Sequence, residues 1–72
     1  MRTVEITREP IELYKILKFE ALVSSGGEAK FVIAEGMVRV NGEVETRKRK
    51  KIVGGDLIDF GDEKLQIQLI TP

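Results

Sequence analysis

The dipeptide Asn41-Gly42 constrains the fold more than any other part of the sequence. It lies between two segments in which apolar and polar residues alternate, 37–40 and 43–45. Asparagine and glycine both tolerate the positive φ angles of a type I′ turn, whose twist matches that of two paired antiparallel strands. The sequence therefore predicts a β-hairpin here, with positive φ at Asn41 and at Gly42.

The segment 11–22 has the apolar spacing of an amphipathic helix. Its residues Leu13, Ile16, Leu17 and Ala21 recur at helical intervals and would share one side of the helix. Pro10 precedes them, and proline suits the first position of a helix, where the amide has no partner in any case. We therefore predict a first helix over residues 11–22.

A second helix is predicted over residues 26–35. Ser25 and Glu28 have the spacing of a capping box, in which the serine oxygen accepts the N3 amide and the glutamate accepts the amide of the cap residue. Gly36 supplies the left-handed residue that commonly ends a helix. Because only a few residues separate the two predicted helices, they should pack against each other.

The remaining segments indicate strands. Residues 3–7 and 64–69 alternate between polar and apolar and are expected to pair with each other, whereas 52–53 and 57–60 flank a turn at residues 54–56. The sequence thus predicts a single α+β domain over residues 1–72. In it, two packed helices lie against a small, mainly antiparallel sheet, with strands added at both termini.

Residues 47–51 are five consecutive cations in a chain with twelve basic and twelve acidic residues. We call them the basic run. Nothing in the run is periodic, so we predict a loop. Its like charges repel one another, and we expect the folded protein alone to gain nothing from them. A bound polyanion would relieve that repulsion and release condensed counterions, which favours nucleic-acid binding over a merely solvated loop.

The order of these parts resembles a known family. A helix ending at Leu22-Val23, then Ser25-x-x-Glu28-Ala29-Lys30, Gly36, Val38-Arg39-Val40-Asn41-Gly42 and Gly55-Asp56 is similar to the S4 (S-four) RNA-binding domain, also called the αL motif. The resemblance covers residues 11–60. It implies binding of structured RNA, with ribosomal and transfer RNA as candidates, through a face made by the two helices and the hairpin.

Carried over position by position, the resemblance implies RNA contacts at Ser25, Lys30, Arg39 and Asn41. The family tends to place cations at the start of the first helix and just after the capping serine, where this chain has Glu12 and Gly26. We expect other cations to take over part of that role: Lys15, Lys18, Arg47, Lys48, Arg49, Lys50 and Lys51. Lys30, Arg39 and most of the basic run should then lie on one continuous exposed face.

Several of these residues also have a structural interpretation. The structural alternative for Lys30 is an ion pair with Glu35, although such exposed pairs contribute only about 0.2–0.5 kcal/mol. Ser25 is expected to act mainly as a cap and Asn41 mainly as a turn residue. Tyr14 and Phe19 are expected to pack against the core rather than to stack on bases. For Gly26-Gly27, a phosphate contact and a merely loose turn remain equally favoured.

The composition argues against catalysis. The chain has no cysteine and no histidine, and it has no P-loop motif, so we expect no catalytic residue, no metal, no other cofactor and no small-molecule substrate. Two alternatives to direct RNA binding remain: an adaptor that binds an acidic protein, and an accessory module for an RNA-modifying enzyme acting in trans. Without an apolar run of about 20 residues or a signal peptide, a cytoplasmic monomer is expected, with RNA as its partner.

Overall fold

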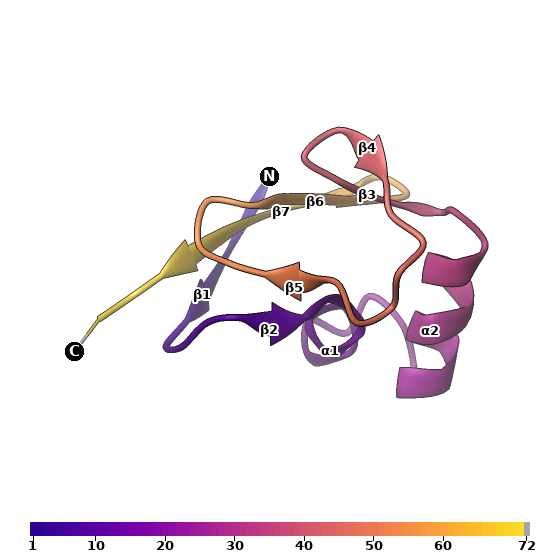
Figure 1. Cartoon of the computed structure of the whole chain (residues 1–72), viewed down its shortest axis with the longest axis horizontal. Helices are drawn as coiled ribbons and strands as arrows, with labels where there is room; N and C mark the ends of the chain where they lie inside the picture. The colour runs from indigo at the N-terminus through magenta and orange to yellow at the C-terminus, as the bar shows by residue number, and fades with distance from the viewer. Residues whose placement is uncertain (72) are drawn as a thin grey trace.

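The computed structural model describes residues 1–71 and has two layers (Figure 1). One layer is a five-stranded sheet in the order β1-β7-β6-β3-β4. The other contains the two helices and a separate two-stranded ribbon, β2-β5. In chain order the elements are β1 (Arg2–Ile6), β2 (Ile11–Glu12), α1 (Leu13–Phe19), α2 (Gly26–Ala34), β3 (Val38–Val40), β4 (Glu43–Val44), β5 (Lys51–Ile52), β6 (Leu57–Phe60) and β7 (Glu63–Leu69).

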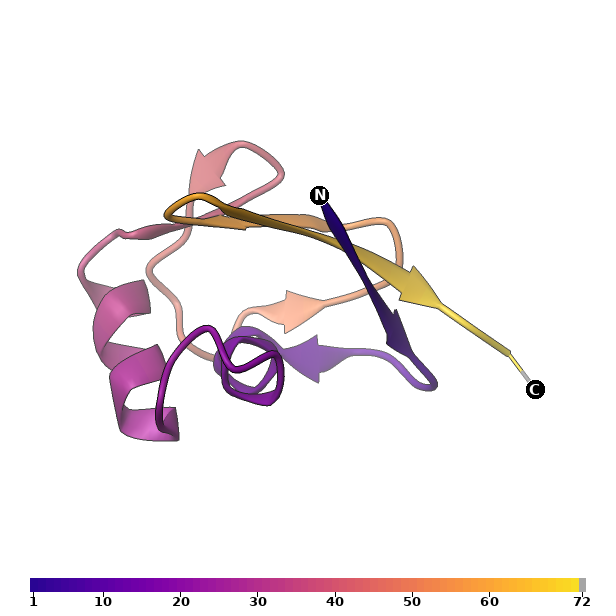
Figure 2. The ribbon, with the colours of Figure 1, turned by 180° about the vertical axis from the view of Figure 1, so that it is seen from behind.

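The terminal strands β1 and β7 lie side by side, as the sequence predicts. They pair in parallel, with Val4 opposite Ile67, whereas the other pairs of the five-stranded sheet are antiparallel. Seen from behind, β1 runs obliquely across β7 (Figure 2). The predicted α+β fold, with a mainly antiparallel sheet and a strand added at each terminus, is confirmed.

The hairpin turn is also confirmed. Asn41 has a φ of 54° and Gly42 a φ of 86°, and β3 pairs with β4 across them. The Asn41 side chain reaches further: its Oδ1 accepts the amide of Leu57 at 2.9 Å, and its Nδ2 donates to Oδ1 of Asp56 at 3.0 Å. The same side chain therefore holds the hairpin turn against the start of β6.

One hydrophobic core fills the space between the two layers. Strands β1, β3, β6 and β7 contribute residues from one face of the sheet, since successive side chains of a strand point to opposite faces. The helices close the core from the other side. Its fully buried large side chains are Leu13, Leu17, Ile33, Val38, Ile52, Ile58, Leu65 and Ile67.

The first helix is shorter than predicted at its N-terminus. It begins at Leu13, and Ile11 and Glu12 form β2, which pairs with Ile52 and Lys51 of β5. The predicted helix start at residue 11 is therefore wrong, and β5 has β2 as its hydrogen-bonded partner. Tertiary pairing overrides local helical spacing here, because Ile52 is fully buried and its strand needs a hydrogen-bonded neighbour.

The same helix also ends earlier than predicted, at Phe19 instead of Leu22. The amide of Ala21 donates to Lys18 O, and that of Leu22 donates to Leu17 O, both at 3.1 Å. These two bonds define a Schellman motif, and they place Ala21 at a φ of 58°. Because alanine occupies the position that usually holds glycine, no sequence signal marks this helix end.

The second helix matches its prediction closely, with one difference at the cap. Ser25 Oγ accepts the amide of Glu28 at 3.1 Å, and Gly36 ends the helix with a φ of 76°. The Glu28 carboxylate, however, accepts the amide and the hydroxyl of Ser24 rather than the amide of Ser25. Those bonds, the one from the backbone amide foremost, lower the pKa of Glu28.

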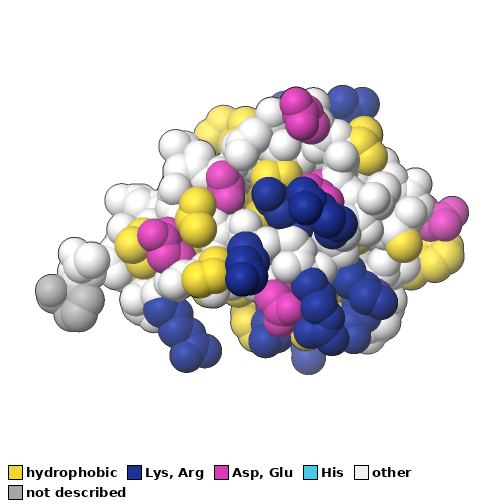
Figure 3. All heavy atoms as spheres, in the orientation of Figure 1, with side chains coloured by type: hydrophobic (Ala, Val, Ile, Leu, Met, Phe, Trp, Pro, Cys, Tyr) yellow, Lys and Arg dark blue, Asp and Glu magenta, His cyan; other side chains and the backbone are white. Residues whose placement is uncertain are grey.

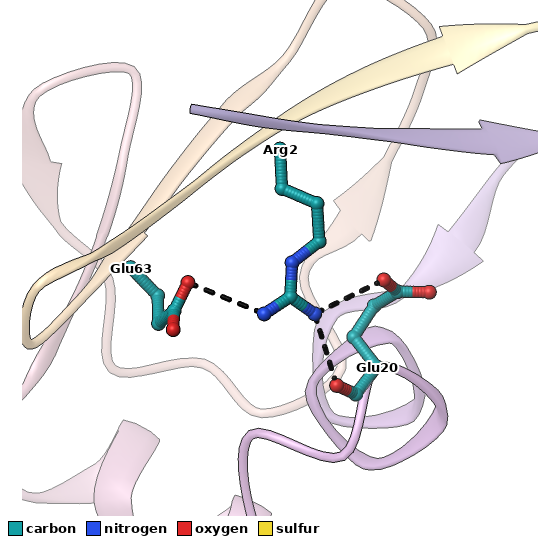
Figure 4. Close-up of polar contacts among 3 residues, drawn as sticks. All are labelled: Arg2, Glu20 and Glu63. Carbon is teal, nitrogen blue, oxygen red and sulfur yellow. Dashed lines mark hydrogen bonds and ion pairs between the residues drawn. The ribbon is translucent and has the colours of Figure 1, made fainter.

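Arg2 ties the sheet to the end of α1 (Figure 4). Its Nη1 donates to the backbone carbonyl of Glu20 at 3.1 Å and to that residue's Oε1 at 3.4 Å, while its Nη2 donates to Glu63 Oε2 at 3.3 Å. One side chain on β1 thus joins the C-cap of α1 to the first residue of β7.

Candidate nucleic-acid interface

The loop that carries the basic run is fixed to the start of α1 by its backbone. The amide of Leu13 donates to Lys50 O at 2.9 Å, and the amide of Tyr14 donates to Lys48 O at 3.1 Å. The first amides of a helix have no partner within it, and α1 has no side-chain cap. The loop carbonyls serve instead, which holds the run across the helix end.

This arrangement gathers cations from three segments around Tyr14. Lys30 Nζ of α2 lies 4.8 Å from the centre of the Tyr14 ring, Arg49 Cζ of the loop lies 5.7 Å from it, and Lys15 Nζ of α1 lies 5.9 Å from it. All three distances are within the range of a cation–π contact. The half-buried ring packs against the core, so it holds these cations at a fixed place on the surface.

Glu12 lies within the same group of charges. Its carboxylate pairs with Lys15 Nζ at 3.2 Å and with Arg49 Nη1 at 3.1 Å. The hydrogen bond from Lys15 is the main reason that the pKa of Glu12 is lowered. Glu12 therefore offsets part of the positive charge around Tyr14.

A second carboxylate occupies the beginning of the basic run. Arg47 Nε and Nη2 donate to the two oxygens of Glu45 at 2.9 and 3.1 Å, and the Arg47 amide donates to Glu45 at 2.9 Å. The side-chain bond is the main cause that lowers the pKa of Glu45 to about 2, and it raises the pKa of Arg47. The expectation that the fold gains nothing from the run is wrong at Arg47 and Arg49, which both have acidic partners.

The run borders an open hollow of about 670 Å³, which is also lined by Ala34 at the end of α2. In the same view as Figure 1, basic side chains crowd the half of the surface in front of the helices and the β4–β5 loop, with a few acidic ones between them (Figure 3). Lys48 and Lys51 are exposed and Lys50 is half-buried. Within residues 1–71, these three lysines form no ion pair with a carboxylate.

The structure brings most of the predicted cations together, but not Arg39. Val38 and Val40 point into the core, so the alternation of β3 directs Arg39 to the opposite face of the sheet. There Arg39 pairs in register with Asp59, and its Nη1 lies 3.4 Å from Gly42 O. The expected single face therefore includes Lys30 and the basic run but excludes Arg39.

Most of the other predicted residues have a role in the fold. Ser25 caps α2 and the Asn41 amide is bonded at both its oxygen and its nitrogen. Lys30 lies over the Tyr14 ring instead of pairing with Glu35. Lys18 is exposed on α1, and Lys51 lies in β5 opposite Glu12 rather than in the loop.

Sequence reasoning missed the central position of Tyr14 and the bridging role of Glu12. The spacing of Glu12 and Lys15 does signal an ion pair one helical turn apart, but no sequence pattern brings Arg49 to them. The expected packing of Tyr14 is confirmed. The expected packing of Phe19 is wrong, because Phe19 is 68% exposed.

Two other kinds of feature are absent from residues 1–71. No group of three or more histidine, cysteine, aspartate or glutamate residues is placed to hold a metal ion. No helix in that part of the chain is long and apolar enough to span a membrane.

Comparison with known proteins gives one consistent family. The family model described as the S4 domain matches residues 4–68. The Escherichia coli (strain K12) protein YbcJ is 46% identical over 68 residues, covering 93% of this chain and 97% of YbcJ. RlbA of Bacillus subtilis (strain 168), named as a probable ribosome maturation protein, is 36% identical over 57 residues, covering 79% of this chain and 80% of RlbA.

A solved structure agrees with these sequence matches. The solution structure of YbcJ from E. coli superposes with a TM-score of 0.73 at 45% identity, covering 94% of this chain and 87% of the other. It is described as revealing an αL motif involved in RNA binding.

Proposed function

Because the chain belongs to the S4 domain family, we propose that it binds structured RNA, without catalysing a reaction on it, through the cations gathered at Tyr14. We define the Tyr14 surface as this ring together with the cations that surround it or follow it in the loop: Lys15, Lys30, Lys48, Arg49, Lys50 and Lys51. The resemblance seen in the sequence and the family membership agree.

The observation that carries the proposal is the convergence of three segments on one ring. Lys15, Lys30 and Arg49 come from α1, α2 and the loop, and their mutual repulsion disfavours this arrangement in the absence of an anion. Glu12 offsets only part of their charge. Phosphates of a bound RNA would supply the remaining counter-charge and release condensed ions.

The shape of the surface favours structured RNA. The loop backbone is bonded to α1, so the cations are held in a fixed pattern rather than on a flexible tail. Double-stranded RNA is recognised mostly through its shape and its phosphates, which a fixed pattern of cations suits.

The name of one relative supports a choice between the candidate RNAs. RlbA is named as a probable ribosome maturation protein, so we propose ribosomal rather than transfer RNA as the target. We further propose that the protein acts in the cytoplasm, and a monomer remains the expectation from the sequence. Ser25, Arg39 and Asn41 lie outside the proposed surface because their side chains serve the fold or face away from it.

Binding to a stable hairpin RNA across a salt series tests the proposal. In the variant Lys30→Gln/Lys48→Gln two cations of the Tyr14 surface are lost, and each neutralised phosphate contributes about 0.7–0.9 to the log–log salt slope. We expect the slope to become shallower by about 1.5 units. Lys64 on β7 is exposed, precedes the buried Leu65 and pairs with Asp59, so it lies on the same outer face of the sheet as Arg39. The matched control Arg39→Gln/Lys64→Gln removes the same charge from that face and should keep the wild-type slope.

Circular dichroism of both variants controls for folding. A folded Lys30→Gln/Lys48→Gln protein that binds RNA with the wild-type slope would refute the Tyr14 surface. Equal loss in both variants would mean that only the net charge of the protein matters.

A further inference from the structure

Phe19, the last residue of α1, is an exposed aromatic side chain that neither the core nor the Tyr14 surface explains. It is 68% exposed, although burying such a side chain would stabilise the fold by about 1.5–3 kcal/mol. A ring left in solvent beside a cationic surface is a candidate contact for a ligand.

Phe19 borders an open hollow of about 470 Å³. This volume is within the range of about 300–1,000 Å³ found for small-ligand sites. Tyr14 and Pro10 provide further apolar lining, and the cations of the same hollow are Arg8, Lys15 and Lys18. Glu12 lines it as well, so the flat ring of Phe19 lies beside three cations and one carboxylate, which offsets part of their charge.

The backbone that carries Phe19 is held in place. The next residue, Glu20, accepts hydrogen bonds from Arg2 through its backbone carbonyl and its carboxylate (Figure 4). The hydrogen bonds that the amides of Ala21 and Leu22 donate to the last turn of α1 fix the segment that follows Phe19. Binding of a ligand that stacks on the ring therefore costs little conformational entropy in this segment.

We propose that Phe19 stacks on an unpaired base of the bound RNA, while Lys15, Lys18 and Arg8 hold the phosphates that flank it. This rests on the proposed function and adds a second element of recognition to it. Every base has a flat face and every nucleotide carries a phosphate, so an unpaired nucleotide matches both the apolar lining and the cationic lining of the hollow. Bases inside an uninterrupted stem are stacked on one another and cannot reach the ring.

Two hairpin RNAs of the same stem test the inference, one uninterrupted and one with a single unpaired 2-aminopurine nucleotide. We expect the wild-type protein to prefer the interrupted hairpin and to change the fluorescence of its 2-aminopurine. Phe19→Ala should weaken binding to that RNA by about 5- to 100-fold, the equivalent of losing one stacked base, and leave binding to the uninterrupted hairpin unchanged. Phe19→Tyr should retain the preference.

The matched control is Phe31→Ala, which removes another exposed phenylalanine, 62% exposed on α2, and should behave like the wild type. A folded Phe19→Ala protein that retains the preference overturns the base site. A wild-type protein that binds both hairpins equally, with a steep salt dependence, also overturns the base site but leaves the proposed function standing. Absence of any salt-dependent binding overturns both.

Analytical ultracentrifugation separates RNA stacking from protein contact. If the wild-type protein self-associates and Phe19→Ala abolishes this, the ring serves a protein interface and the base site is refuted. An unchanged sedimentation coefficient in the variant agrees with the base site.

Discussion

Nδ2 of Asn41 donates a hydrogen bond to Oδ1 of Asp56 at 3.0 Å, which joins the tip of the β3–β4 hairpin to the turn before β6. Oδ1 of Asn41 is also engaged, because it accepts the amide of Leu57. Asn41 therefore combines two structural tasks: a positive φ angle and a link between turns.

Replacement of Asn41 separates these tasks. Asn41→Gly keeps the backbone conformation but loses both side-chain bonds, so it should lower the free energy of unfolding by about 1–2 kcal/mol. Asn41→Ala loses the same bonds and adds the cost of a left-handed alanine, about 1 kcal/mol more. Urea unfolding of the three proteins measures both steps, and equal stability of the two variants would contradict the assigned strain.

The C-terminal ends of α1 and α2 allow a pair of opposite substitutions. Ala21 and Gly36 occupy the same Schellman position, with φ angles of 58° and 76°. Ala21→Gly should stabilise the protein by about 0.5–1 kcal/mol by relieving the left-handed alanine. Gly36→Ala should destabilise it by about 1–2 kcal/mol, because its new Cβ meets Val44 at an ordinary 3.5 Å and only the φ angle is unfavourable. Thermal unfolding measures the two opposite shifts, and a stability loss in Ala21→Gly would refute this account.

The ion pair of Glu45 and Arg47 predicts a specific acid sensitivity. The folded protein holds the pKa of Glu45 at about 2, below its ordinary value of 4.5. A depressed carboxylate pKa stabilises the fold above the unfolded value and loses that contribution as the pH falls through the folded value. The contribution should therefore be complete above about pH 4.5 and absent below about pH 2.

Glu45→Gln tests whether this contribution to stability is lost as the pH falls. The Arg47 side chain is 72% exposed, so solvent screening keeps the contribution of the pair small. The difference in unfolding free energy between wild type and Glu45→Gln should be largest at pH 6 and vanish towards pH 2. A difference that is constant with pH would show that the ion pair is not its cause.

Glu12 should weaken RNA binding by wild-type protein. Its carboxylate occupies Lys15 and Arg49, and Glu12→Gln would free both cations for phosphates. We expect a several-fold higher RNA affinity and a salt slope steeper by about one unit or more. Glu5→Gln, which removes an exposed carboxylate from β1, is the control for net charge. A similar gain in both variants would mean that the position of Glu12 is unimportant.

The sequence predicted those parts of the fold that depend on local chemistry. Asn41-Gly42 and the Ser25 cap both carry their signals within a few residues, and both are confirmed. The start of α1 could not be predicted in this way. It depends on the pairing of Ile11 with Ile52, residues that are distant in sequence, and on loop carbonyls that satisfy the first amides of the helix.

The candidate site shows the same division. The basic run and Lys30 were recognisable as cations in the sequence, and the contact of the run with a polyanion stays a prediction. The meeting of these cations at Tyr14 was not recognisable, because it depends on how α1, α2 and the loop pack. Arg49 gained its acidic partner for the same reason, because Glu12 reaches it only in the folded chain, whereas the partner of Arg47, Glu45, is two residues away.

The bonds from Leu13 and Tyr14 to the loop carbonyls of Lys50 and Lys48 have a consequence for how such a protein can change. The fold uses the backbone carbonyls of this loop, and every residue type at positions 48 and 50 carries the carbonyl that accepts these bonds. Side chains at 48 and 50 are thereby released from the requirements of folding. Substitution there can adjust the strength of a charged contact step by step, while the path of the chain, and with it the placement of that contact, is inherited unchanged.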